Sequence, residues 1–116
     1  MKDFLLITPP FTQLNTPYPA TPYLKGFLNT KGFSSFQMDL GIEVILELFT
    51  SERLRYIFDA AYENNAIQSE NSERIHALRE DYIRTVDPVI LLLQGKNPTL
   101  ARQICTGNFL PQASRF

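Results

Sequence analysis

Hydrophobic positions at the start of the chain predict a buried strand followed by a long loop. Residues 4–7 form a continuous apolar run, Phe-Leu-Leu-Ile, and Pro9 and Pro10 end it. Such a run is typical of a strand buried on both faces, because a surface strand would alternate polar and apolar residues. Residues 9–20 carry four prolines, which excludes a helix and favours an ordered, extended loop.

The pattern then predicts a helix and a second strand. Thr21 suits the N-cap of the helix, with Pro22 at the first helical position, and Gly32 supplies its C-terminal stop. Residues 34–40 alternate polar and apolar side chains, as expected for a strand that runs parallel to the first one after a right-handed crossover. Residues 1–41 are therefore predicted to form a β-α-β unit.

The rest of the chain is predicted to be helical. The expected helices span residues 42–49, 54–62, 72–86, 88–94 and 98–106. Asp87-Pro88 and Asn97-Pro98 would each be a cap followed by a proline, at the start of the last two helices. Residues 42–107 are thus a helical extension of the β-α-β unit, and residues 108–116 are expected to be an irregular tail.

The predicted fold class is α/β, a truncated Rossmann-like β-α-β start with two parallel strands followed by mostly helices. Large apolar residues on the predicted buried faces form the expected core: Leu24, Phe27, Leu28, Ile42, Ile45, Phe49, Ile57 and Phe58. A sheet of two parallel strands leaves two unpaired edges. Either the helices wrap the pair, or a second copy completes the sheet by self-association, or the chain is a fragment of a longer protein.

Composition and charge narrow the partners. The chain has 116 residues and a formal net charge of −1, with basic residues scattered along it, so no basic stripe is available for nucleic acid or anionic lipid. Its longest apolar stretch, residues 88–93, is too short to cross a bilayer, and no signal-peptide core follows Met1. We therefore expect a cytoplasmic protein without a membrane or nucleic-acid partner.

Residues that usually carry chemistry are sparse. The single cysteine, Cys105, excludes an internal disulfide and any metal site built from cysteines, and it is expected to be buried. The lone histidine, His76, is expected to be solvated on a charged helical face. No nucleophile has a base at a suitable spacing. We therefore predict no catalytic residue and no metal ligand in this chain.

The loop after the first strand is the best candidate for binding, since open α/β sheets bind ligands at the carboxyl ends of their strands. A conventional NAD site is not expected, because Pro9-Pro10 stands where the glycines of that site belong. Asp39, at the end of the second strand, is predicted to be a cap or a loop anchor. The loop itself would either line a pocket with Phe11, Tyr18 and its polar residues or merely pack over the sheet.

Several segments resemble a known family. Residues 5–10, 15–20 and 24–28, with Gly32-Phe33 and residues 37–43, are similar to the start of radical SAM enzymes that carry an N-terminal cobalamin-binding domain. Residues 93–101 and 109–116 resemble one branch of that family. The resemblance implies a Rossmann-like domain whose strand-end loops face the corrinoid. It assigns that role to Pro9, Pro10, Thr12, Asn15, Thr16, Tyr18 and Asp39.

The family also implies what lies outside this chain. A following barrel in such enzymes holds a [4Fe–4S] cluster through three cysteines and cleaves S-adenosylmethionine, and this chain has no three-cysteine motif. The expected function is thus that of an N-terminal cobalamin-binding fragment, not catalytic alone. Its parent would be a methyltransferase or an iron–sulfur oxidoreductase-like enzyme, with the remainder of that parent as partner. The alternative is a helical docking module without a cofactor.

Overall fold

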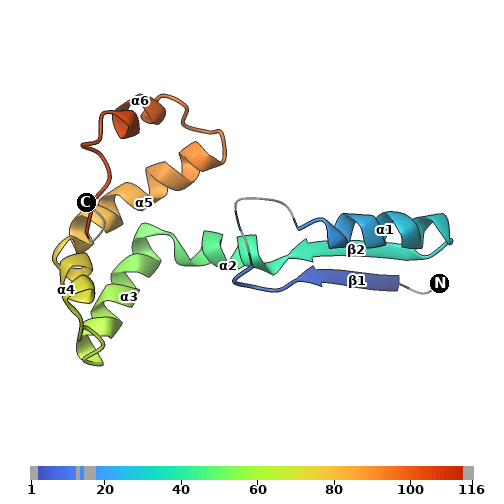
Figure 1. The fold of residues 1–116 in the computed structure, drawn as a ribbon, viewed down its shortest axis with the longest axis horizontal. Helices are drawn as coiled ribbons and strands as arrows, with labels where there is room; N and C mark the ends of the chain where they lie inside the picture. Colours follow the sequence, from blue (N-terminus) through green and yellow to red (C-terminus); the bar gives the residue numbers. More distant parts are fainter. Residues whose placement is uncertain (1–2, 13, 15–17, 114–116) are drawn as a thin grey trace. The chain divides into compact units, whose positions relative to one another are not determined.

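A computed structural model describes residues 3–12, 14 and 18–113. The fold class predicted from the sequence is confirmed, since two parallel strands are followed by mostly helices (Figure 1). The chain divides into two compact units, Met1–Leu46 and Glu47–Phe116. Each unit is described by itself below.

Unit 1 holds the predicted β-α-β arrangement. Strands β1 (Asp3–Thr8) and β2 (Ser34–Asp39) pair in parallel, from Asp3 opposite Ser34 to Thr8 opposite Asp39. Helix α1 (Ala20–Thr30) connects them. It begins one residue before Thr21, directly after Pro19 and without a side-chain cap, so the prediction of a Thr21 cap is wrong. Gly32 adopts the left-handed conformation expected of the stop, with φ +78°.

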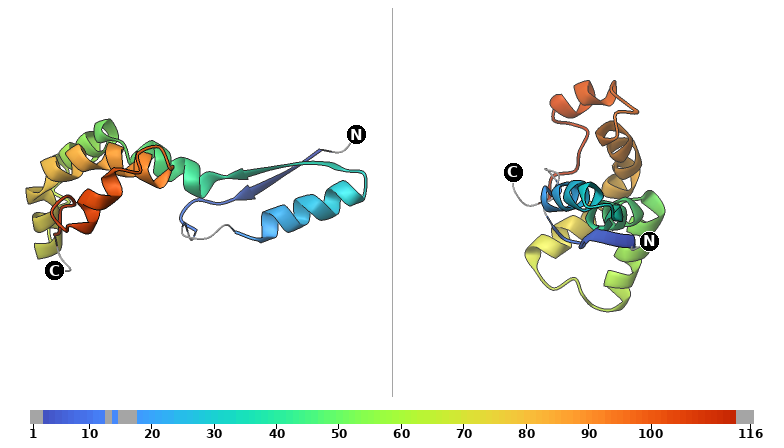
Figure 2. Two further views of the ribbon diagram at one scale, coloured as in Figure 1. Left: turned by 90° about the horizontal axis from the view of Figure 1, so that it is seen from above. Right: turned by 90° about the vertical axis from the view of Figure 1, so that its right-hand side faces the viewer.

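Helix α1 covers one face of the strand pair (Figure 2). Ser35, a buried residue of β2, donates its hydroxyl to Asn29 Oδ1 (2.8 Å) and to the carbonyl oxygen of Lys25 (3.3 Å). Because side chains alternate along a strand, the residues next to Ser35 point away from the helix. The prediction that β1 is buried on both faces is therefore wrong, and Thr8 is its one buried residue.

The predicted core is also wrong in part. Five of its eight residues are exposed: Leu24, Phe27, Ile42, Phe49 and Ile57. In α1 the cause is the rotation of the helix, because the polar contacts of Lys25 and Asn29 with Ser35 turn that side toward β2. Leu24 and Phe27 then lie on the flank. No apolar residue that the structure describes in unit 1 is buried.

Helices make up the remainder of the described chain. They are α2 (Leu40–Leu48), α3 (Ser51–Glu63), α4 (Glu70–Ala77), α5 (Arg79–Leu93) and α6 (Leu100–Cys105). The predicted helix over 72–86 is interrupted at Leu78, which ends α4 and begins α5. The predicted break at Asp87-Pro88 is absent from α5, which continues through Pro88. Ile42 and Ile45 of α2 were expected in the core, but Gly41 is the one buried residue of this helix.

The role of Asp87 explains the error at Pro88. Instead of capping the residues that follow it, the Asp87 carboxylate accepts a hydrogen bond from the backbone N–H of Ser51 (3.0 Å), the first residue of α3. A proline inside a helix costs about 3 kcal/mol because it removes a backbone hydrogen bond and crowds the preceding turn. Burial of Ile83 and Val86 just before Pro88 offsets that cost.

The apolar core of the described residues lies in unit 2. It consists of Ile83 and Val86 of α5 with Leu100 of α6. Thr85 is buried beside them and donates its hydroxyl to the carbonyl oxygen of Asp81 (2.7 Å), so its polar atom is satisfied. Three of these four residues belong to α5, which marks it as the central helix of the unit.

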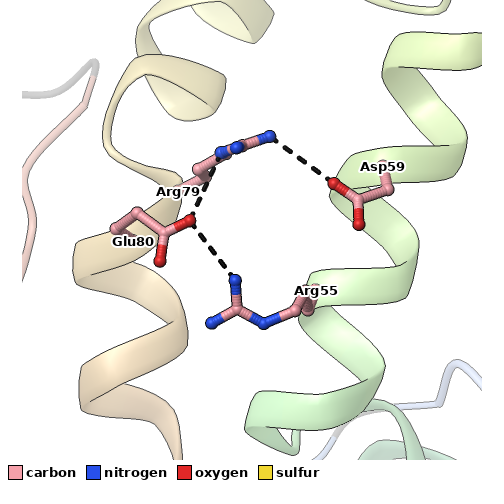
Figure 3. A network of polar contacts seen from close by, with 4 residues as sticks. All are labelled: Arg55, Asp59, Arg79 and Glu80. Atoms are coloured by element: carbon pink, nitrogen blue, oxygen red, sulfur yellow. Dashed lines mark hydrogen bonds and ion pairs between the residues drawn. The ribbon is translucent and has the colours of Figure 1, made fainter.

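Ion pairs add a polar contact between α3 and α5 (Figure 3). Arg79 Nη1 lies 3.5 Å from Asp59 Oδ1, while Glu80 Oε1 lies 3.5 Å from both Arg79 Nε and Arg55 Nη1. All four side chains are more than one third exposed, so each pair contributes at most about 1 kcal/mol. The apolar core thus contributes more to holding the helices together.

Two further expectations concern helix α6 and the cysteine at its end. Cys105 is exposed at the end of α6, so the prediction that it is buried is wrong. Helix α6 is shorter than predicted, and neither Asn97 nor Pro98 is part of it. Within the described ranges, none of the helices is both long enough and apolar enough to span a bilayer.

Candidate functional site

The two strand ends lie level with one another and carry the best-defined polar cluster of unit 1. Thr8 and Asp39 are opposite each other in the parallel register, and α2 begins immediately after Asp39. Asp39 Oδ1 accepts a hydrogen bond from the backbone N–H of Ile42 (3.1 Å). The prediction that Asp39 is a strand-end cap is confirmed, since it satisfies one of the free amides at the start of α2.

The loop after β1 folds back onto this strand end. Thr12 donates its hydroxyl to the carbonyl oxygen of Pro9 (3.2 Å), which closes a turn over the buried Gly41. A Cβ atom on Gly41 would lie 3.1 Å from Asp39 Oδ1, 3.2 Å from Thr12 Oγ1 and 3.5 Å from the Pro9 oxygen. Three predicted site residues, Pro9, Thr12 and Asp39, therefore meet around a glycine.

Gly41 was not among the predicted site residues. The sequence signal that identifies it is a glycine two positions after an acidic strand end, where the backbone must pass close to another segment. Any larger side chain at this position would press on oxygen atoms that are already hydrogen-bonded. Gly41 therefore fixes where the loop sits relative to the strand ends.

The same loop contains a strained residue. Phe11 has a φ of +62° and is 85% exposed. A positive φ is rare for a bulky residue, and such strain is concentrated at binding and catalytic sites. Pro10 is half-buried beside it, and Tyr18 is exposed just before α1. The loop thus presents two exposed aromatic rings. The predicted residues Asn15 and Thr16 lie outside the described part of the chain.

His76 occupies a different environment from the one predicted. Its ring stacks on Tyr62 (centroids 5.7 Å apart) and meets the edge of Phe58 (6.1 Å), both from α3. Its Nε2 atom is buried and has no hydrogen-bond partner among the described residues. His76 is therefore a packing residue between α3 and α4, and the prediction of a solvated histidine is wrong. An open groove of about 680 Å³ lies beside it, lined also by Glu63 and Glu73.

The described residues contain no group of three or more histidine, cysteine, aspartate or glutamate side chains placed to hold a metal ion. Comparison of the chain with known protein families, curated proteins and solved structures finds no match. The strand-end cluster of unit 1, formed by Pro9, Thr12, Asp39 and Gly41, is accordingly the candidate site that the geometry singles out.

Proposed function

We propose that this chain is a cobalamin-binding module of a radical SAM enzyme, in which the strand-end cluster lies against the corrinoid. The observation that carries the proposal is the position of the loop, which packs against Gly41 at the carboxyl ends of two parallel strands. Ligands of open α/β sheets bind at this position. The resemblance of residues 5–43 to the start of such enzymes points to the corrinoid as the ligand.

The residues at the strand ends fit a large, flat ligand. Phe11 and Tyr18 present exposed rings that can pack on an apolar macrocycle. Oxygen atoms of Thr12, Pro9 and Asp39 stand close together and can accept hydrogen bonds from the amide side chains of a corrinoid. Because Gly41 has no Cβ atom, these three oxygen atoms can lie close to its backbone. The chain's own part would be to bind and orient the cofactor.

In a parent enzyme, a bound corrinoid would supply methyl transfer or radical rearrangement chemistry, which belongs to the cofactor. The proposal places the [4Fe–4S] cluster and S-adenosylmethionine in the remainder of that enzyme, which is the proposed partner. It also includes the cytoplasmic location predicted from the sequence.

Titration of the purified chain with hydroxocobalamin, followed by its absorption spectrum, tests this proposal. Gly41→Ala should weaken binding at least about tenfold, because the new methyl group would lie 3.1 Å from Asp39 Oδ1 and 3.2 Å from Thr12 Oγ1, so both side chains would have to shift. Gly26→Ala is the matched control, since a Cβ at that exposed position meets nothing within 4 Å. The proposal fails if the wild-type chain binds no corrinoid, or if both alanine variants bind it equally.

The alternative, a helical docking module without a cofactor, has support from a different observation. Tyr56, Leu91 and Leu93 of unit 2 are exposed on α3 and α5, and exposed apolar side chains on helices are common at docking surfaces. This function requires no corrinoid. An absence of any spectral change on titration, with the helices intact by circular dichroism, would favour it.

A further inference from the structure

One face of the strand pair in unit 1 is apolar and uncovered. Ser35 points toward α1, so the residues on either side of it in β2 point the other way. Two rungs of the ladder form this bare face, with Leu5 opposite Phe36 and Ile7 opposite Met38. These side chains are 57%, 60%, 48% and 39% exposed, respectively.

The bare face is large for an exposed surface. Its four side chains offer on the order of 400 Å² of apolar area, as much as the largest patch on a typical monomer. Parallel strands are normally covered on both faces, and within unit 1 the one face that a helix covers is that of Ser35. A surface of this kind marks an interaction site.

We propose that a second copy of this chain covers the bare face, with the two strand pairs packed face to face about a two-fold axis parallel to the strands. This axis places β1 of one copy over β2 of the other. Leu5 then packs on Phe36 of the second copy, and Ile7 packs on Met38. Each branched aliphatic side chain meets a longer or aromatic one, so the patch is complementary to itself, as an isologous interface requires.

Charge is compatible with this arrangement. The third rung of the same face is polar, with Asp3 opposite Ser34 and hydrogen-bonded to it. The proposed axis brings Asp3 over Ser34 of the second copy, so the two Asp3 carboxylates do not face each other. A net charge of −1 per chain adds little repulsion between copies.

The area fits a weak dimer. Two bare faces and their rims bury roughly 1,000 Å² in total, which is near the lower limit for a specific interface. We therefore expect reversible association in the micromolar range rather than a permanent dimer. The contact does not use the strand-end cluster, so it stands or falls independently of the corrinoid proposal.

Sedimentation velocity across a wide concentration series tests the dimer. Phe36→Glu should weaken association at least about tenfold, because it places a charge at the centre of the contact. Phe27→Glu is the matched control, since Phe27 is 59% exposed but lies on α1, away from the bare face. Its dissociation constant should stay within about twofold of wild type.

Circular dichroism checks that each variant keeps its fold, and Phe36→Gln replaces Phe36→Glu if the charge unfolds the strand. Three results would overturn the proposal. The wild-type chain could be monomeric at every concentration, which would mean that another part of the same chain covers the face. Phe27→Glu could weaken association as much as Phe36→Glu, placing the contact elsewhere. Association could also survive in Phe36→Glu, which would point to pairing of strand edges.

Discussion

The hydrogen bond from Ser51 to Asp87 gives a sharp test of how unit 2 is held together. Ser51 is the first residue of α3, and its amide has no partner within that helix. The Asp87 carboxylate of α5 accepts from it at 3.0 Å, although 36 residues separate the two in sequence. Thr50 Oγ1 accepts a hydrogen bond from the backbone N–H of Arg53 (3.2 Å), another amide in the first turn of α3. Asp87 therefore joins two helices through a cap.

Loss of this contact in Asp87→Ala should lower the free energy of unfolding of unit 2 by about 1–2 kcal/mol. A helix N-cap contributes about that amount, and the negative charge adds a few tenths of a kcal/mol at the positive end of the α3 dipole. Asp87 is exposed, so water replaces part of the lost bond and keeps the value in this range. Asp87→Asn should lose less, because its amide oxygen can still accept.

Asp81→Ala is the control for this experiment. It makes the same substitution in the same helix, but Asp81 pairs with the exposed Arg84, three residues further along α5, rather than with another helix. That pair should contribute under about 0.5 kcal/mol. Thermal melts followed at the helical circular-dichroism band should show a shift of about 4–8 °C per kcal/mol for a unit of this size. Equal melting temperatures for the two alanine variants would refute the cross-helix cap.

Three further predictions follow from burial and composition. Leu100→Ala should lower the free energy of unfolding by about 2–4 kcal/mol in a urea titration, because it removes the side chain through which α6 contacts the core. The exposed Leu93→Ala is the control, and an equal loss of stability in both variants would contradict this prediction. Phe27→Ala should lower the free energy of unfolding by less than about 1 kcal/mol, since the ring is largely exposed. A loss above about 3 kcal/mol would show that Phe27 is a core residue. The reconstituted chain should not cleave S-adenosylmethionine, because one cysteine cannot hold a [4Fe–4S] cluster, and product formation in a turnover assay would disprove it.

Local signals account for what the sequence predicted correctly. The β-α-β order rests on an apolar run, a proline-rich loop and Gly32, all of which act within a few residues. Asp39 could be recognised as a cap because its position at a strand end is itself a local property. Burial was predicted less well. Leu5 and Phe27 belong to apolar patterns. Such a pattern indicates which face of a strand or helix is apolar, but it does not indicate whether another part of the protein covers that face.

Long-range contacts account for the remaining errors. Asp87-Pro88 has the local sequence of a helix start, yet the Asp87 carboxylate accepts a hydrogen bond from the backbone N–H of Ser51 in another helix. The prediction that His76 is solvated is wrong because two aromatic rings of α3 pack against it. At the candidate site, the convergence of Thr12 and Asp39 on Gly41 depends on the path of the loop, and no spacing along the chain encodes that path.

The two units differ in what stabilises them, and this difference relates the two proposals. Every buried apolar residue that the structure describes belongs to unit 2, whereas the buried residues described in unit 1 are Thr8, Ser35 and Gly41. Hydrogen bonds therefore organise unit 1, while its apolar side chains are available to other surfaces. Any ligand that binds only the folded unit stabilises it by mass action. Corrinoid at the strand ends and a second copy on the bare face would each bind this folded state, so each should stabilise unit 1 against unfolding without using the other's contacts.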